Sequence, residues 1–397
     1  MYQIDYNSYR SVKGFNRRVR FLVMHYTAID FAASVRALAS DGTVSAHYLV
    51  PDPDDKTYIA AGFNDMRVFN LVDENERAWH AGVSSWAGRS NLNDTAIGIE
   101  VVNLASDNDG LFVFPPYNPV QIDAIKALAI NILQRYPDIS PVNVVGHSDI
   151  APDRKSDPGA AFPWKTLYEA GVGAWYDDNT RSAYLAQFTA GGMPSDEDII
   201  ARLKTYGYDV SGATTASGLH LLVRAFQLHF RQENYDGVID ADTAAVIYAL
   251  VDKYFPDKKQ PLYYSVQPWL SSRYYVNEHF QLGIENEGDG KFELLYIPEK
   301  DGFIIKDVAS GQSVKWNGQE GVGNLEWATT NINDDYMLWT LELQGGVKAG
   351  VIIHNRKNTS MVWDVHNYDP ALSKPVKLEV EHPKGMTDRN AQVFVLK

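Results

Sequence analysis

The hydrophobic pattern of this chain changes its period twice, and this change limits the possible folds more than any other feature of the sequence. Up to about residue 180, short apolar runs alternate with an amphipathic helical stretch. From about 181 to 256 the apolar spacing is helical, and from 262 onward alternating apolar residues and Gly or Asn turns are typical of strands. The 397 residues therefore predict three domains, over 1–180, 181–258 and 262–397.

The first region has the pattern of an α/β domain. Val19–Met24, Ala96–Val102 and Val142–Val145 are apolar runs that fit buried strands. Val120–Arg135 carries apolar residues at helical spacing, and Pro137 ends the run. Strands that alternate with a helix predict a central mixed sheet flanked by helices.

The second region predicts a small three-helix domain. Its helices are indicated by apolar residues in 199–203, 219–226 and 243–250, and a turn is expected at Asp236–Asp240. Pro256, Pro261 and the charged residues between them mark a linker.

The third region predicts an all-β domain with a weak internal repeat. Three pairs of similar segments carry the repeat: 302–305 with 350–353, 313–316 with 360–363, and 338–341 with 393–396. A poorer third copy is expected between Pro261 and Glu299.

The composition excludes several classes of protein. The formal net charge of −14 argues against nucleic acid as a partner and against a basic helix at a membrane surface. The chain has no cysteine, so it forms no disulfide and no Cys-type metal site. No apolar run approaches the length of a membrane span, and Met1–Asp5 show no signal peptide. The sequence leaves open a cytoplasmic protein, export without a cleaved signal, or a signal that has been removed.

Two histidines and one aspartate have the residue types and the placement of a catalytic zinc site. His25 and His147 each directly follow a predicted strand, where the side chains of an α/β sheet tend to face the site. Asp157 comes ten residues after His147. Two imidazoles and one carboxylate leave a fourth position on zinc for water. Taken singly, a histidine at a strand end is more often a hydrogen-bonded structural residue, so the hypothesis depends on the whole set.

Two further residues fit the chemistry of such a site. Glu100 lies at the end of another predicted strand, and Lys155 is two residues before Asp157. A carboxylate beside an activated water is a general base, and an ammonium group stabilises an oxyanion.

Five motifs carry a resemblance to a known family. They are Met24-His25-Tyr26-Thr27, Ser45-Ala46-His47-Tyr48-Leu49-Val50, Ala78-Trp79-His80-Ala81-Gly82, Ile97-Gly98-Ile99-Glu100 and Gly146-His147-Ser148-Asp149-Ile150-Ala151-Pro152. In this order they resemble the type 2 N-acetylmuramoyl-L-alanine amidases, whose zinc amidase fold is shared with peptidoglycan recognition proteins. Arg154-Lys155-Ser156-Asp157-Pro158-Gly159 looks most like the AmiD-like branch. The resemblance covers about residues 15–180.

The resemblance implies a role for each site residue. His25, His147 and Asp157 match the zinc ligands, Glu100 the residue that activates water, and Lys155 the lysine that stabilises the tetrahedral intermediate. The implied reaction is hydrolysis of the amide between the lactyl group of N-acetylmuramic acid and L-alanine, with peptidoglycan or muropeptides as substrate. Asp153 departs from the pattern, which has a small or neutral residue there.

The aromatic residues and remaining histidines near these motifs have two interpretations each. His80, Trp79 and Trp86 are predicted to line the substrate pocket, with packing or support of a ligand as the equal alternative. For His47 we favour a structural role in the sheet.

The other two regions also resemble known families. Three segments of the helical region, 198–208, Val223-Arg224-Ala225-Phe226-Gln227 and Asp236-Gly237-Val238-Ile239-Asp240, resemble a small peptidoglycan-binding domain, and a spacer without a ligand is the alternative. The β-rich region is similar to ricin-type β-trefoil lectins, although its units close with Gln392-Val393-Phe394 and Met337-Leu338-Trp339, a degenerate form of the Gln-x-Trp signature. Trp316, Trp327 and Trp363 either stack on sugars or fill the core, and we favour the core.

Three biological settings follow from this sequence. An antibacterial effector would act in the periplasm or on the cell wall, would be exported by a contact-dependent secretion apparatus and would have an immunity protein as partner. An endogenous enzyme of cell-wall recycling and a peptidoglycan-binding protein without catalysis are the alternatives.

Overall fold

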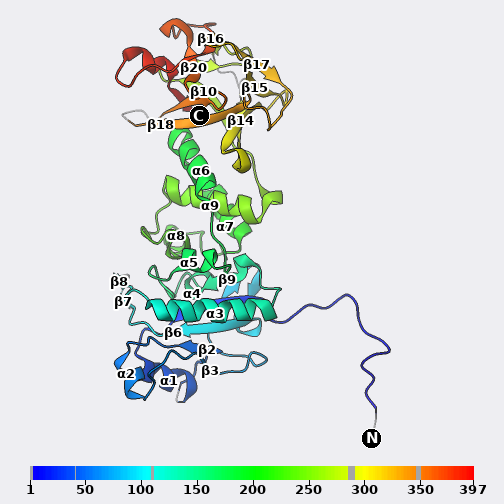
Figure 1. The fold of residues 1–397 in the computed structure, drawn as a ribbon, viewed down its shortest axis with the longest axis vertical. Helices are drawn as coiled ribbons and strands as arrows, with labels where there is room; N and C mark the ends of the chain where they lie inside the picture. Colours follow the sequence, from blue (N-terminus) through cyan, green and yellow to red (C-terminus); the bar gives the residue numbers. More distant parts are fainter. Residues whose placement is uncertain (1–2, 41, 109–110, 285–290, 346–349) are drawn as a thin grey trace. The chain divides into compact units, whose positions relative to one another are not determined.

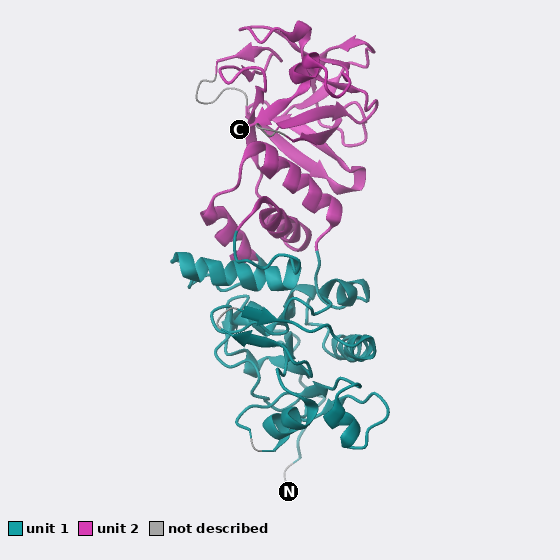
Figure 2. Cartoon of the chain, turned by 90° about the vertical axis from the view of Figure 1, so that its left-hand side faces the viewer, with its two compact units in different colours: residues 1–175, 206–238 teal, residues 176–205, 239–397 magenta. Residues whose placement is uncertain are grey.

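The structure is a computed structural model that describes residues 3–40, 42–108, 111–284, 291–345 and 350–397 (Figure 1). The chain divides into two compact units (Figure 2). Unit 1 comprises residues 1–175 and 206–238, and unit 2 comprises 176–205 and 239–397. The boundary between the units passes twice through the segment predicted as a helical domain, and the three-domain division stays a prediction.

Unit 1 is built on a five-stranded mixed sheet with the strand order β3-β2-β6-β1-β9. Its four parallel strands and the one antiparallel strand, β3, are β1 (Phe21–Tyr26), β2 (Tyr48–Val50), β3 (Phe69–Asn70), β6 (Ala96–Val101) and β9 (Val144–Gly146). Two short hairpins lie outside the sheet, β4 (Ser85–Trp86) with β5 (Arg89–Ser90) and β7 (Ser106–Asn108) with β8 (Leu111–Val113). The α/β architecture predicted for this region is confirmed.

The helices of unit 1 are α1 (Phe31–Ala39), α2 (Lys56–Ala60), α3 (Pro119–Arg135), α4 (His147–Ile150), α5 (Trp164–Glu169) and α8 (Ala216–Phe230). In α3 the side chain of Asn118 caps the first turn and Pro119 occupies the first helical position, as expected for a helix start. Gln121 is buried and donates to the backbone oxygen of Val102 at 2.9 Å, so α3 is fixed over the carboxyl end of β6.

The first strand begins and ends two residues later than predicted. The apolar run ends at Met24, but β1 continues to Tyr26 because its parallel ladder with β6 pairs His25 with Glu100 and Tyr26 with Val101. His25 therefore lies within the strand rather than beyond it. Residues in register on neighbouring strands point to the same face of a sheet, so His25 and Glu100 share a face.

Unit 2 contains α6 (Asp178–Gly191), α7 (Asp196–Tyr206, whose last residue belongs to unit 1) and α9 (Ala241–Tyr254). The structure thus adds α6 to the three helices predicted for the middle region. α6 packs against α9, where Arg181 forms an ion pair with Asp242. None of the helices in the described part of the chain has the length and apolar character needed to cross a bilayer.

The β-rich part of unit 2 is a closed ring of six antiparallel strands. The ring consists of β10 (Tyr263–Pro268), β13 (Lys291–Ile297), β14 (Gly302–Asp307), β18 (Leu338–Gln344), β19 (Gly350–Asn355) and β22 (Phe394–Leu396). Three further strand pairs are β11 (Tyr275–Val276) with β12 (Leu282–Gly283), β15 (Ser313–Trp316) with β17 (Leu325–Ala328), and β20 (Met361–Val365) with β21 (Val376–Val380). β16 (Val322–Gly323) pairs with β21. The all-β class predicted for this region is confirmed.

The internal repeat corresponds to equivalent strands. The paired sequence segments lie in β14 and β19, in β15 and β20, and in β18 and β22. Trp316 and Trp363 are buried in the core of this region, and Trp327 is half-buried and packs against the same core. All three tryptophans therefore contribute to the hydrophobic core, which is the role favoured for them from the sequence.

Candidate active site

Three side chains of metal-binding type converge at the carboxyl end of the unit 1 sheet. His25 comes from β1, His147 is the first residue of α4 directly after β9, and Asp157 follows α4. His25 Nδ1 lies 2.9 Å from Asp157 Oδ2 and 3.0 Å from His147 Nδ1, and His147 Nδ1 lies 3.1 Å from the same carboxylate oxygen. All three side chains are buried. The structure thus brings together the three residues that the sequence selected.

The outward-facing ring nitrogens indicate how these histidines are protonated. His147 Nε2 lies 3.1 Å from the backbone oxygen of Ala81, which only accepts, so Nε2 carries the proton. His25 Nε2 lies 3.0 Å from His80 Nδ1. A proton on His25 Nε2, donated to His80, would leave two Nδ1 lone pairs and a carboxylate oxygen facing one another within about 3 Å. Such a set of acceptors fits a cation, and the supporting hydrogen bonds are those that orient metal ligands.

The electrostatics of His25 and Asp157 favour the states that bind metal. Burial lowers the pKa of His25 to about 4, which keeps its imidazole neutral. Burial opposes ionisation of Asp157, but the charges and hydrogen bonds of His147 and His25 outweigh it and hold the pKa of this carboxyl below its ordinary value. Neutral imidazole and ionised carboxylate are the ligand forms that zinc requires.

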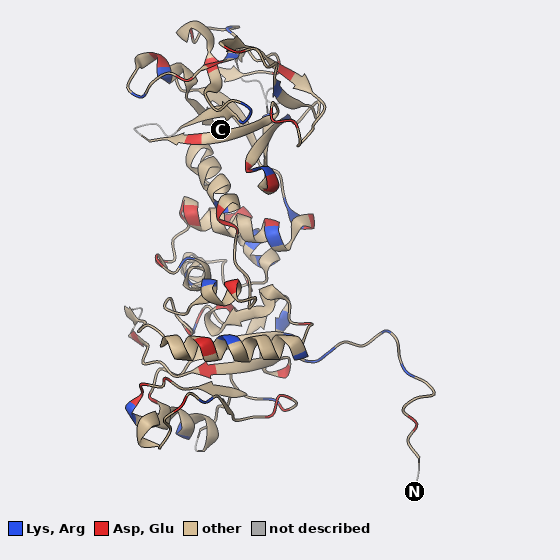
Figure 3. Ribbon diagram, viewed as in Figure 1, with Lys and Arg blue, Asp and Glu red and all other residues tan. Residues whose placement is uncertain are grey.

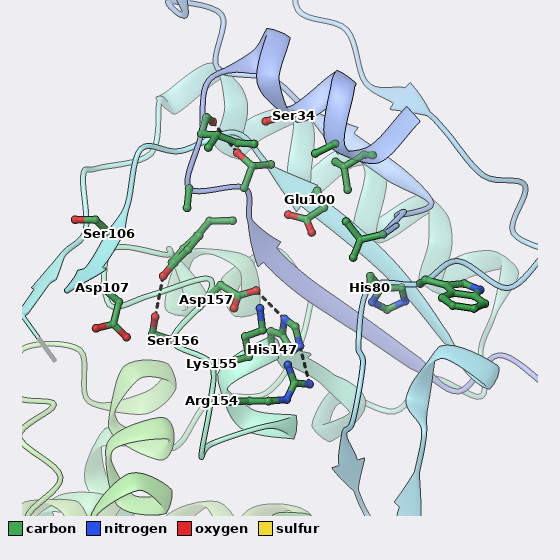
Figure 4. A pocket seen from close by; sticks show the side chains of 18 residues that line it. Ser34, His80, Glu100, Ser106, Asp107, His147, Arg154, Lys155, Ser156 and Asp157 are labelled. Carbon is green, nitrogen blue, oxygen red and sulfur yellow. Dashed lines mark hydrogen bonds and ion pairs between the residues drawn. The ribbon is translucent and has the colours of Figure 1, made fainter. Parts of the chain in front are cut away.

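Glu100 and Lys155 line the cavity beside this cluster (Figure 4). The cavity has a volume of about 390 Å³ and is also lined by His147 and Asp157. Burial, followed by the charge of Asp157, raises the pKa of Glu100 well above its ordinary value. Among the described residues, the buried Oε2 of Glu100 has no hydrogen-bond partner. A buried carboxyl with one unsatisfied oxygen facing a cavity is suited to exchange a proton with a bound molecule.

Two residues that the sequence analysis did not select hold the backbone beside the cluster. Asn93 Oδ1 accepts hydrogen bonds from the backbone N–H groups of His80 at 3.0 Å and Ala81 at 2.7 Å. The guanidinium of Arg154 donates to the backbone oxygen of Ala81 at 2.7 Å and to that of Val83. The carbonyl that orients His147 is therefore itself fixed from both sides. Arg154 lay within a quoted motif, but nothing in the sequence connects Asn93 with the site.

The predicted substrate contacts lie in different surroundings. Trp79 and His80 line the cavity, Trp79 with 59% of its surface exposed. Trp86 is 1% exposed, donates its indole N–H to the backbone oxygen of Val142 at 3.1 Å and packs edge-on against Tyr208. Trp86 is thus a core residue, and its prediction as a substrate contact is corrected to the packing alternative.

His47 has the structural role that was favoured for it. Its Nδ1 accepts from the backbone N–H of Gly98 at 3.0 Å, and its Nε2 lies 3.3 Å from the backbone oxygen of Glu76. These contacts fix the residue before β2 to β6 and to the loop that contains Glu76.

Charge is distributed without separation of sign over the described parts of both units, where acidic and basic residues are interspersed (Figure 3). The cavity reflects this mixture, since it is lined by the carboxylates of Glu100, Asp107 and Asp157 and by the cations of Arg154 and Lys155. Both signs of charge are thus available to a polar substrate.

Comparison with known proteins identifies the family. The family model described as N-acetylmuramoyl-L-alanine amidase matches residues 15–160. N-acetylmuramoyl-L-alanine amidase AmiD of Escherichia coli K12 is 42% identical over 258 residues, which are 64% of this chain and 90% of AmiD.

Solved structures agree with this family. The crystal structure of AMPDH3 from Pseudomonas aeruginosa is 60% identical and covers 64% of this chain and 99% of its own, with a TM-score of 0.62. The complex of E. coli AmiD with the substrate anhydro-N-acetylmuramic acid-L-Ala-D-gamma-Glu-L-Lys is 42% identical and covers 64% of this chain and 95% of its own, with a TM-score of 0.57. The chain belongs to the N-acetylmuramoyl-L-alanine amidase family and is an enzyme of that class.

Proposed function

We propose that the chain is a zinc-dependent peptidoglycan amidase that hydrolyses the bond between the lactyl group of N-acetylmuramic acid and L-alanine of the stem peptide. The observation that carries this proposal is the convergence of three potential metal-ligand atoms, from His25, His147 and Asp157 and all within 4.8 Å of one another, beside the unsatisfied carboxyl of Glu100. Relatives in this family support the substrate class, because AMPDH3 has been solved in complex with anhydromuramic pentapeptide.

His25, His147 and Asp157 would hold the zinc ion. Bound there, zinc supplies Lewis-acid polarisation of the amide carbonyl and makes water more acidic. Glu100 accepts a proton from the attacking water as its oxygen bonds to the carbonyl carbon, and later returns a proton to the departing amine of L-alanine. Lys155 offers its ammonium group to the oxyanion that develops on the carbonyl oxygen. Breaking the C–N bond then leaves a lactyl carboxylate and a stem peptide with a free amine.

Mass spectrometry of digested peptidoglycan tests this reaction. Stem peptides that begin at L-alanine should be released by the enzyme, and a zinc chelator should abolish their release. Glu100→Ala should abolish it as well while zinc remains bound. Muropeptide cleavage that is unchanged in Glu100→Ala would show that Glu100 is not the general base.

Substrate contacts are proposed at the rim of the cavity, where Trp79 and His80 are placed to meet the sugar or the stem peptide. The helical segment around 181–258 is proposed to bind peptidoglycan. The ring of six strands with its three added strand pairs supports assignment of residues 262–397 to a lectin-like β-trefoil. Weak binding modules on one chain raise the effective concentration of the enzyme at the wall.

The proposed biological setting is that of an antibacterial effector that acts on the cell wall in the periplasm, is delivered by a contact-dependent secretion apparatus and is neutralised by an immunity protein. The feature that motivates this proposal is the β-rich region of residues 262–397, which lies outside residues 15–160 that the amidase family model matches. Expression directed to the periplasm should lyse cells, whereas cytoplasmic expression should not. Equal toxicity in both compartments would contradict the effector role and leave wall recycling as the setting.

A further inference from the structure

A carboxylate that the proposed mechanism does not use lies directly behind the metal cluster. Asp149 is in α4, two residues after His147, and is completely buried. It accepts three hydrogen bonds: from the backbone N–H of Gly146 at 2.7 Å, from the hydroxyl of Tyr208 at 2.6 Å, and from His229 Nδ1 at 2.7 Å. A buried carboxylate is costly unless it is hydrogen-bonded in this way, so all three donors stabilise one position of Asp149.

Asp149 is placed to control two of the three cluster residues. α4 has only four residues, and a single helical turn is unstable without tertiary contacts. The N–H of Ser148, at the start of the same turn, donates to the backbone oxygen of Asp157 at 2.8 Å. The turn therefore joins His147 and Asp157, and Asp149 fixes the turn.

Two of the three donors to Asp149 come from a segment far along the chain. Tyr208 and His229 belong to residues 206–238, which form part of unit 1 although they lie in the region predicted as a separate helical domain. His229 stacks on Trp164 with ring centroids 3.8 Å apart, which holds its ring in place. The neighbouring Gln232 donates to the backbone oxygens of Ala160 and Phe162 at 2.7 and 2.6 Å, just after Asp157.

We propose that Tyr208 and His229 are positioning residues of the metal site, which act through Asp149 on the turn that joins His147 to Asp157. Residues 206–238 thereby complete the metal site. This inference rests on the proposed zinc site, so the test must distinguish failure of the positioning role from failure of the zinc site itself.

The test compares full-length variants by zinc affinity, measured by competition with a chelator, and by the unfolding midpoint of the metal-free protein. Tyr208→Phe removes one hydroxyl and should weaken zinc binding about tenfold, at the lower end of the effect of losing a supporting hydrogen bond at a metal site. Asp149→Asn should weaken it at least as much.

Tyr184→Phe is the matched control because Tyr184 donates to the carboxylate of Asp252 in unit 2, and this variant should lower the unfolding midpoint without changing zinc affinity. Wild-type zinc affinity in both Tyr208→Phe and Asp149→Asn would overturn the inference, as would an equal loss in Tyr184→Phe. Wild-type affinity in His147→Ala would instead overturn the zinc site and with it the proposed function.

Discussion

Each unit buries a carboxylate whose surroundings raise its pKa, Glu100 in unit 1 and Asp364 in unit 2. Burial is the largest cause in both, and a neighbouring carboxylate adds to it, Asp157 for Glu100 and Glu379 for Asp364. Each also has one buried oxygen without a hydrogen-bond partner among the described residues. By these measures alone the two groups are equivalent.

Their neighbours distinguish them. Glu100 lines a cavity together with Lys155, and shares a sheet face with the metal-binding cluster through its register with His25. Asp364 is 2% exposed on β20, and the side chain opposite its Oδ2 is that of His382, whose Nε2 lies 4.0 Å away. A perturbed carboxyl therefore marks a candidate site only where other reactive groups and an open cavity converge on it.

The largest difference is expected when each carboxyl is replaced by its amide. Glu100→Gln should lower kcat by about 10²- to 10⁴-fold, the usual contribution of a general base. Asp364→Asn should leave kcat unchanged. Release of stem peptides from purified muropeptides, followed by chromatography, measures both, with zinc content determined for each variant. A similar loss of kcat in the two variants would remove the distinction drawn between them.

The aromatic residues beside the two carboxyls should respond in opposite ways. Trp363 is fully buried, with its ring centroid 5.8 Å from Trp339 and 6.0 Å from Phe394. Trp363→Ala should therefore lower the free energy of unfolding by about 3–5 kcal/mol. Trp79→Ala, at an exposed site, should change it by no more than about 0.5 kcal/mol and should raise KM instead. Denaturant unfolding and steady-state kinetics measure the two effects, and a stable Trp363→Ala variant would contradict the core assignment.

A smaller effect is expected from Arg154, which supports the metal-binding cluster next to Glu100 in unit 1. Arg154→Lys keeps the charge but loses the fork that holds the backbone oxygens of Ala81 and Val83. Because the Ala81 oxygen orients His147, zinc affinity should fall about 10- to 100-fold. Arg135→Lys is a control in the same unit, since Arg135 forks onto Glu74 instead. Chelator competition measures the affinity, and an equal fall in both variants would assign the effect to general stability.

The sequence predicted those parts of unit 1 in which local pattern and tertiary environment agree. The structure contains the strands predicted around Val19–Met24 and Ala96–Val102 and the helix predicted over Val120–Arg135. In each of them the spacing of apolar residues agrees with the face that is buried. The family motifs identified the cluster residues themselves. Both ends of β1 were wrong by two residues, since pairing with β6 and not hydrophobicity decides where it runs.

Features that depend on distant partners were not predicted. α6 buries small and polar residues such as Ala183 and Gln187 together with the aromatic Tyr184 and Phe188, so its sequence lacks one apolar stripe. Asn93 and Tyr208 are polar residues whose importance depends on contacts across the fold, the latter with Asp149, which is 59 residues away. Trp86 was expected at the pocket because its neighbours in the sequence are there, yet its ring points into the core.

The smallest expected effect is a change in how stability depends on pH. Burial raises the pKa of Asp364 from 3.8 to about 6. Between these values the folded protein retains a proton that the unfolded chain has lost, so this group makes stability fall as pH rises from about 4 to 6. Asp364→Asn resembles the protonated form and escapes that loss. The free energy of unfolding of Asp364→Asn minus that of the wild type should therefore be greater at pH 7 than at pH 4, by on the order of 1 kcal/mol. Urea unfolding at both pH values measures this difference, and parallel pH profiles for the two proteins would show that Asp364 is ionised without cost in the folded state.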